Sequence, residues 1–176
     1  MRKITVIFLV LGLALTVMAC GEKPAEKGAT AKPGQQAVKK ADKPAPAKGE
    51  AYDCEKFSLT LADGWKAGPL KMGMVNVLPN GKYSPGLYFK FEGNGNAAGT
   101  AEASIESMIE RYNGSPMEST TIAGIEFKTT TYSHGGSDQT MHVAFHEGTK
   151  ITITIEGKDA KNNADIKAMI ASLKFK

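Results

Sequence analysis

Residues 51–176 are predicted to form one α+β domain, an antiparallel sheet of six strands with two main helices in the order βββαβββα. Three observations predict this class. Several segments alternate apolar and polar residues, which is the period of strands with one buried face and is typical of antiparallel sheets. Two segments repeat apolar residues at helical spacing. The connections are short and contain turn residues, so neighbouring strands can pair directly.

The first three strands are expected before the first helix, at residues 57–61, 72–78 and 87–91. In the first and the third, apolar residues occupy every second position, so each strand has one buried face. Residues 63–65 form a turn after the first strand, and Pro79-Asn80-Gly81 is a hairpin signal after the second. Trp65 is expected in the core, because aromatic side chains mainly serve packing.

The first helix is predicted from an apolar stripe at i, i+3, i+4 and i+7, formed by Ile105, Met108, Ile109 and Tyr112. Thr100 can cap its N-terminus, and Gly114 can end it. Three more strands are expected after it, at residues 125–132, 141–146 and 151–156. A second stripe, from Ile166 to Leu173, predicts the last helix.

Residues 1–19 are predicted to be a lipoprotein signal peptide. Arg2 and Lys3 precede an almost wholly apolar, uncharged run from Ile4 to Ala19. As a helix this run would span about 24 Å, which is short of the roughly 30 Å of a bilayer core. A basic start, a short apolar run and a small residue before the break are typical of a secretory signal. An uncleaved anchor helix is the alternative.

The end of the apolar run, Val17-Met18-Ala19-Cys20, resembles the bacterial lipobox, although Met18 is bulkier than the usual residue. The resemblance implies that the Cys20 thiol receives a diacylglycerol, that the signal is cut before it, and that the new N-terminus is acylated. Several fatty acyl chains, such as palmitate, hold a protein stably at a bilayer, so membrane lipid is a partner through acylated Cys20. Ordinary cleavage after Ala19 is the alternative.

The resemblance also implies a location in the bacterial cell envelope. Gly21 follows the lipid site, and the absence of an Asp there resembles the sorting pattern for the outer membrane, with the domain facing the periplasm. Lipidation of Cys20 leaves Cys54 as the remaining cysteine, so no internal disulfide is expected. Cys54 is then either buried as a small hydrophobe or exposed as a thiol that can pair between molecules.

Residues 20–50 are predicted to be the lipidated Cys and a disordered tether rich in Lys, Ala and Pro. Val38 is its only large aliphatic residue, so the segment cannot bury enough apolar surface to order itself. Residues 21–50 hold seven lysines and four acidic residues, whereas residues 51–176 hold 13 basic and 14 acidic residues. The folded part is therefore nearly neutral, and a nucleic-acid partner is not expected.

The three histidines are the candidate metal ligands. On a strand, His142 and His146 would share a face but lie about 13 Å apart. Zinc needs its ligands at about 2.0–2.1 Å from one ion. The alternation over residues 141–145 indicates a strand, so solvent-exposed histidines are expected and no metal is assigned. Metal binding, with His134 as a further ligand, or pH sensing is the alternative.

The polar faces of the later strands are the candidate partner-binding surface, which consists of Tyr132, His142, His146, Thr152 and Thr154. The Thr/His face of the strands at 141–146 and 150–156 is too polar to lie under a helix. A polar face without a helix over it is open to a protein or small-molecule partner. We therefore expect this face to contact the partner.

No catalytic constellation is found in the sequence, and no cofactor is expected. Residues 93–98 match the dinucleotide fingerprint only loosely, because the preceding strand alternates and no parallel βαβ unit is evident. His134-Gly135-Gly136 resembles an esterase oxyanion loop, but no Gly-x-Ser-x-Gly accompanies it. A hairpin turn explains these glycines.

Three segments share a pattern with a known family: residues 57–65, residues 122–127 and residues 166–175. They resemble the PsbP-like superfamily, which includes the extrinsic oxygen-evolving subunit of photosystems and bacterial periplasmic relatives such as DcrB-like lipoproteins. Ala62-Asp63 departs from the Pro that the family often has before Gly-Trp. The resemblance implies a central antiparallel sheet sandwiched by helices, and a mostly non-enzymatic assembly or binding role without shared catalytic residues.

The sequence therefore predicts a membrane-anchored envelope lipoprotein that presents a small binding or assembly domain to an envelope protein or a small molecule. Two alternatives from other classes stay open. One is an envelope hydrolase, which would need titratable groups converging near His134 or His142. The other is a metal chaperone that uses His142 and His146 with Met141 or Met72.

Overall fold

The computed structural model describes residues 44–93 and 99–176. Its strands are β1 (Ala51–Asp53), β2 (Phe57–Thr60), β3 (Trp65–Ala67), β4 (Met74–Pro79), β5 (Gly86–Glu92), β6 (Glu118–Ile122), β7 (Ile125–His134), β8 (Ser137–His146), β9 (Thr149–Glu156) and β10 (Lys174–Phe175). Its helices are α1 (Ala101–Tyr112), the short 3₁₀ turn η1 (Ala160–Asn162) and α2 (Ala164–Ser172). Neither α1 nor α2 is long and apolar enough to cross a bilayer.

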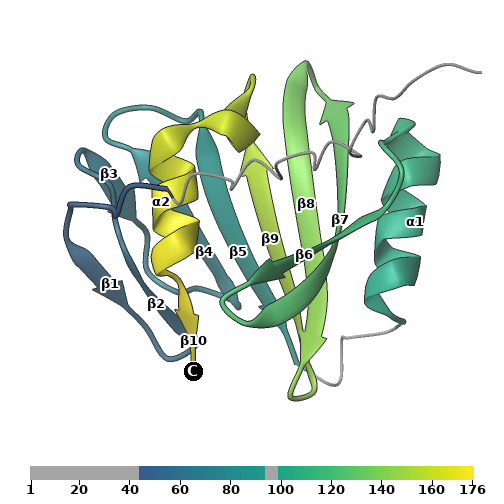
Figure 1. Ribbon diagram of the computed structural model, residues 1–176, viewed down its shortest axis with the longest axis horizontal. Helices are drawn as coiled ribbons and strands as arrows, with labels where there is room; N and C mark the ends of the chain where they lie inside the picture. The colour runs from purple at the N-terminus through teal and green to yellow at the C-terminus, as the bar shows by residue number, and fades with distance from the viewer. Residues whose placement is uncertain (1–43, 94–98) are drawn as a thin grey trace, which may run out of the picture. The chain divides into compact units, whose positions relative to one another are not determined.

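The strands form two antiparallel sheets (Figure 1). The large sheet has the order β3-β4-β5-β9-β8-β7-β6, and the small sheet has the order β1-β2-β10. This arrangement confirms the predicted α+β class, although six strands is too low a count. Four strands were not predicted. Of these, β1, β3 and β10 have two or three residues, too few to show a period, and the fourth is β6.

Two-residue turns join the last four strands of the large sheet. Gly135-Gly136 connects β7 to β8, and Glu147-Gly148 connects β8 to β9, with positive φ at every position. Such turns match the twist of paired strands. Ala123-Gly124 makes the same kind of turn between β6 and β7, with φ of 49° and 84°. Alanine is rare at positive φ, so no turn motif marks this hairpin or β6 before it, although residues 122–127 belong to a segment that resembles the PsbP-like superfamily.

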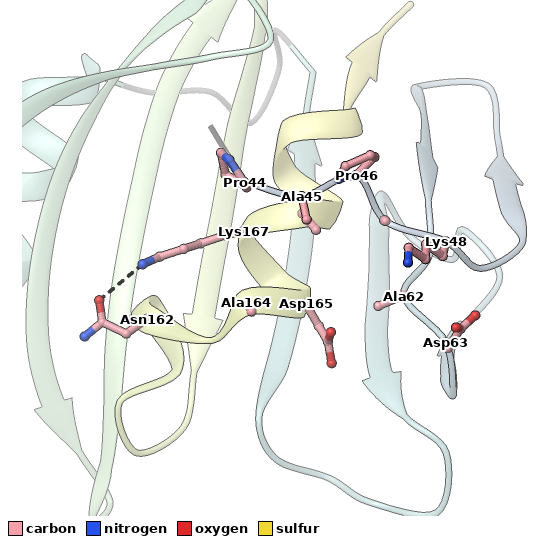
Figure 2. Close-up of a pocket in the computed structure, with 12 residues that line it drawn as sticks. Pro44, Ala45, Pro46, Lys48, Ala62, Asp63, Asn162, Ala164, Asp165 and Lys167 are labelled. Atoms are coloured by element: carbon pink, nitrogen blue, oxygen red, sulfur yellow. Dashed lines mark hydrogen bonds between the residues drawn. The ribbon is translucent and has the colours of Figure 1, made fainter. Parts of the chain in front are cut away.

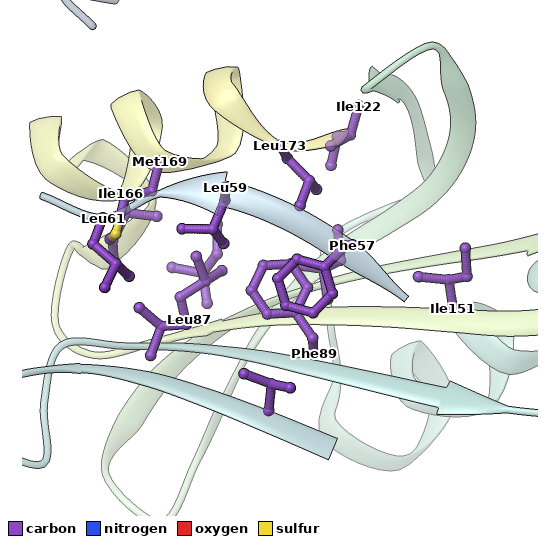
Figure 3. Close-up of a cluster of buried hydrophobic side chains, with 14 of the residues drawn as sticks. Phe57, Leu59, Leu61, Leu87, Phe89, Ile122, Ile151, Ile166, Met169 and Leu173 are labelled. Atoms are coloured by element: carbon purple, nitrogen blue, oxygen red, sulfur yellow. The ribbon is translucent and has the colours of Figure 1, made fainter. Parts of the chain in front are cut away.

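The main core lies between one face of the large sheet and a cover made by the small sheet and α2 (Figure 3). Phe57 of β2 packs against Phe89 of β5, with ring centroids 4.4 Å apart. Ile166 and Met169 of α2 are fully buried in the same cluster. Trp65 is buried as predicted, and its Nε1 donates a hydrogen bond to Oδ2 of Asp165 at 3.1 Å. This bond ties β3 to α2.

Helix α1 packs against β7 and β8 on the opposite face of the large sheet. Thr100 caps it as predicted, with Oγ1 accepting from the Ala103 N–H, and Ile105 is fully buried. The Tyr112 ring stacks on Tyr132 of β7, with ring centroids 5.0 Å apart. Helix α1 covers one face of β8 and the core covers the other, so the middle of β8 has no solvent-exposed face. The sequence predicted a strand with only one buried face. Both Val143 and Ala144 are buried.

The described chain begins before the predicted domain boundary at residue 51. The N–H of Gly49 donates to the Leu61 carbonyl at 2.8 Å, and the N–H of Leu61 donates to the Glu50 carbonyl at 2.8 Å. These bonds fasten the last residues of the predicted tether to the end of β2. The predicted signal peptide, Cys20 and most of the tether lie outside the described residues.

Candidate functional site

The core-facing side of the large sheet becomes polar along part of β7 and β8, beside Phe127 and Ala144 of the same two strands, which still belong to the apolar core. We call its apolar part, on β4, β5 and β9, the closed half; it consists of Val75, Val77, Leu87, Phe89, Phe91, Ile151 and Ile153. We call its polar part, on β7 and β8, the open half; it consists of Thr129, Thr131, Thr140 and His142. The main cover, β2 and α2, packs on the closed half, and a groove lies beside α2 over the open half.

The groove has a volume of about 370 Å³. Its wall residues come from β6, β9 and α2, and they include Ile122, Ile155, Ile166 and Ile170. Polar lining comes from Thr140 and His142 of β8 and from Thr120 and Thr121 of β6. Lys161 of η1 and Lys167 of α2 supply exposed ammonium groups. An apolar hollow with a few converging polar groups is the usual form of a small-molecule site.

His142 is the buried titratable group of the groove. Its side chain is only 8% exposed, and Nδ1 lies 2.8 Å from Oγ1 of Thr129. Burial lowers the pKa of His142 to about 4, because the charged imidazolium loses its hydration. The ring is therefore neutral at pH 7. Among the described residues Nε2 has no hydrogen-bond partner, and it is accessible rather than enclosed, so it can bond water or a ligand in the groove.

The threonines of the open half bond mainly to one another or to His142. Oγ1 of Thr131 lies 3.3 Å from Oγ1 of Thr140, and Thr129 binds His142 as described. These bonds satisfy polar side chains that would otherwise be costly to bury. The bond between Thr129 and Nδ1 also orients the His142 ring, and Nε2 bears the proton in the tautomer in which the hydroxyl donates to Nδ1.

Comparison with known proteins identifies the fold. No family model matches the sequence, and no curated protein matches it. A solved structure that matches is cyanobacterial PsbP (CyanoP) from Synechocystis sp. PCC 6803, with a TM-score of 0.51 at 14% identity over 72% of this chain and 92% of that one. The domain has a PsbP-like fold. At this identity the likeness shows the fold alone.

A second match is a crystal structure from Bacteroides thetaiotaomicron VPI-5482, with a TM-score of 0.51 and 10% identity. The match covers 73% of this chain but 48% of that one, so this chain spans about half the length of the Bacteroides protein. The fold that the sequence resemblance implied is thereby confirmed. The lipoprotein assignment stays a prediction.

The PsbP-like domain does not bring the three histidines together. His142 and His146 share one face of β8, with the buried Ala144 between them. His146 is exposed as expected, but His142 is not, because β6, α2 and η1 surround it. His134 lies on the opposite face, where its ring is 4.8 Å from the Tyr112 ring. Within residues 44–93 and 99–176, no three His, Cys, Asp or Glu side chains are placed to hold a metal ion.

The five residues of the candidate partner surface also divide between the two faces. Tyr132 is buried under α1, and its hydroxyl donates to Oε1 of Gln139 at 2.8 Å. Burial raises the pKa of this Tyr132 hydroxyl. Thr152 and Thr154 are half-buried on the same face as Tyr132, whereas His142 and His146 face the other way. They form no single surface.

Sequence reasoning missed the walls and the charges of the groove. Ile166 and Ile170 were predicted as part of a helical stripe, but nothing in the sequence indicates which strands the helix leaves uncovered. Lys161 and Lys167 lie on the turn and the helix that follow β9, and no motif marks them. The polarity of the Thr/His face of β8 was the one available signal, and His142 and Thr140 do line the groove.

A second hollow, of about 420 Å³, lies where residues 44–48 run beside α2 (Figure 2). Pro44 and Lys167 line both hollows, so this segment borders the groove as well. The carboxylate of Asp165 in the second hollow already accepts from Trp65. The nearby Lys167 ammonium lies 3.4 Å from Oδ1 of Asn162. The titratable side chains of the second hollow are all exposed, whereas the groove contains the buried His142, so the second hollow is the weaker candidate.

The remaining sequence features lie elsewhere. Cys54 is a free, half-buried cysteine whose thiol donates to the Phe57 carbonyl at 3.4 Å. It therefore takes part in the packing before β2, as a small hydrophobe does. Most of the loose dinucleotide fingerprint, residues 94–98, lies outside the described residues, as does the lipid attachment site.

Proposed function

We propose that this chain is a lipid-anchored envelope lipoprotein whose PsbP-like domain binds a partner in the groove over the open half. The anchor is supported by the lipobox-like residues that end in Cys20 and by the Lys/Ala/Pro-rich segment after them. Binding is supported by the groove itself, which contains a buried imidazole with Nε2 unpaired among the described residues. Nε2 is not enclosed by protein atoms, because no buried side-chain nitrogen or oxygen among the described residues lacks a hydrogen-bond partner, so a ligand in the groove can reach it.

The make-up of the groove favours binding over hydrolysis. A histidine acts as a general base most effectively when its pKa lies near the working pH and a third group orients it. The pKa of His142 is about 4, and its described side-chain partner is the hydroxyl of Thr129. Such an imidazole is a weak base at pH 7, but it is a good neutral hydrogen-bond donor.

The anchor is tested with two cysteine variants that serve as matched controls. Cys20→Ala is expected to move the protein from the membrane fraction to the soluble fraction, whereas Cys54→Ala stays with the membrane. Mass spectrometry of the purified natural protein is expected to find an N-terminal peptide that begins at residue 20 and includes the acyl mass. An unmodified residue 20 would refute the anchor.

The binding role is tested by photo-crosslinking in intact cells. A photoreactive amino acid replaces Ala171 or Thr121, which are exposed residues of the groove lining, or Lys66 on the distant strand β3 as the control. Adducts are expected from the two groove positions and not from position 66. Equal labelling at all three positions, or no labelling at the groove, would contradict a binding role for the groove.

A further inference from the structure

Resting on that proposed function, we infer that the groove binds a small amphipathic carboxylate. The aliphatic body of the ligand lies against Ile122, Ile166 and Ile170, and its carboxylate accepts a hydrogen bond from Nε2 of His142. Lys161 and Lys167 supply the positive charge that balances the bound anion. Size, charge and the unpaired imidazole support this inference.

The size of the groove favours a small molecule over a folded partner. Its volume of about 370 Å³ falls at the lower end of the roughly 300–1,000 Å³ that small-molecule sites occupy. A protein partner would more often need a broad, flat surface of about 800 Å² on each side. The isoleucines that line the groove match an aliphatic chain, because removing apolar surface from water is favourable and not directional.

The charge of the groove favours an anion. Its described lining contains two lysines, Lys161 and Lys167, and no acidic side chain. Residues 51–176 hold 13 basic and 14 acidic residues, so this positive charge is a local concentration on a nearly neutral domain. Charge complementarity of this kind increases the rate of capture and excludes cations.

The buried imidazole favours a carboxylate over other polar groups at that position. In the tautomer in which the Thr129 hydroxyl donates to Nδ1, Nε2 bears the proton and can donate to an anionic oxygen, and we assign this tautomer to the bound state. Hydrogen bonds to an ionised acceptor are about twice as strong as neutral ones. Burial lowers the pKa of His142 in the free protein. The negative charge of a bound carboxylate favours the protonated imidazolium, so the pKa of His142 is expected to rise on binding.

Other charged groups near His142 lie outside the groove. Glu118 of β6 pairs in register with Thr129, but its side chain is exposed and does not line the groove. Asp138 and Asp159, together with Lys158, line a neighbouring hollow of about 350 Å³ that shares Thr140, Ile155 and Lys161 with the groove. These two carboxylates repel an anion from that hollow, so the ligand carboxylate is expected on the His142 side.

The test is calorimetric titration of the mature chain, residues 20–176, with Cys20→Ala. Without the acyl chains and the apolar run Ile4–Ala19, this protein needs no detergent. The probes are decanoate, decanol and decylammonium, which share one aliphatic chain and differ in the head group. Decanoate is expected to bind about tenfold or more tightly than either of the others at pH 7. Equal affinity for decanoate and decanol, or no binding of decanoate at millimolar concentration, would overturn the inference.

Surface variants separate the charge from the fold. A double variant, Lys161→Gln with Lys167→Gln, is expected to weaken decanoate binding about tenfold, whereas Lys66→Gln on β3 leaves it unchanged. All three lysines are exposed, so the variants are expected to fold. An unchanged affinity in the double variant would contradict the assigned role of the lysines.

Titration by NMR gives the decisive readout at the imidazole. The His142 ring is expected to titrate near pH 4 in the free protein and at a higher pH with decanoate bound. No change in its titration would overturn the His142–carboxylate contact. Crosslinks from Ala171 to a protein, without decanoate binding, would reject the carboxylate and leave the proposed binding function intact.

Discussion

The closed and open halves of one sheet face obey the same strand period but have opposite consequences. In the closed half every core-facing residue is aliphatic or aromatic, and β2 and α2 cover it. In the open half the same face presents Thr129, Thr131, Thr140 and His142, and a groove lies over it. The apolar half stabilises the domain, and the polar half leaves room for a ligand. The chemical type of the core-facing residues therefore determines whether a strand face is covered or lines a groove, and alternation alone does not.

The two halves also differ in what their buried side chains require to be stable. The Phe57 and Phe89 rings, 4.4 Å apart, need only close packing. A buried imidazole needs hydrogen bonds as well, and His142 obtains one from Thr129. Mutations should therefore act on stability in the closed half and on pH response and ligand binding in the open half.

The largest effect is expected from Phe89→Ala in the closed half. Phe89 is buried against Phe57, and truncating a buried Phe costs about 3–5 kcal/mol through lost burial and the remaining cavity. Ile170→Ala on the half-buried groove wall is the matched variant and should cost about 1–2 kcal/mol. Urea denaturation measures both. Equal losses would remove the distinction between the halves.

The next effect is the pH dependence of His142. The unfolded chain has an ordinary His pKa of about 6.5, whereas the folded chain has about 4. Between these values the unfolded state binds more protons, so stability is full above pH 6.5 and falls as the pH drops towards 4. The loss attributable to His142 by pH 4 is about 3 kcal/mol.

Carboxylates also titrate in this range, so the measurement compares the wild type with His142→Gln. The variant lacks the imidazole, and its free energy of unfolding should fall less between pH 7 and pH 4. Denaturant unfolding at several pH values gives the difference. Parallel curves for the two proteins would show that His142 is already charged, or solvated, in the folded state.

The smallest effect concerns the helix that borders both halves. Oδ1 of Asn163 accepts a hydrogen bond from the Ile166 N–H at 3.1 Å and caps α2. Asn163→Ala should destabilise the domain by about 1 kcal/mol. Asn163→Asp keeps the hydrogen-bond acceptor and should therefore retain most of the stability that the cap contributes. Thermal unfolding followed by circular dichroism is the measurement. A loss as large in Asn163→Asp as in Asn163→Ala would argue against the cap.

Local patterns predicted the closed half well. The alternation of Leu87, Phe89 and Phe91 identified both the strand and its buried face. On the opposite face of the sheet, the helical stripe at Ile105 identified α1 with its Thr100 cap. These features depend on residues close in sequence, where period and propensity act directly.

The open half was less accessible because it depends on contacts that are distant in sequence. His142 is buried by β6, α2 and η1. Strand β6 had no period to detect, and its turn at Ala123-Gly124 lacks the usual residues. The polar face of β8 was visible, but alternation alone does not distinguish a solvated face from the lining of a groove.

The hydrogen bond between Trp65 and Asp165 makes tryptophan fluorescence a reporter of this domain. It is the single tryptophan of the chain, and its indole N–H is held by Asp165 on the helix that walls the groove. Intrinsic emission therefore reports on the seating of that helix without an added dye. A shift in emission wavelength when the groove fills would follow occupancy in real time.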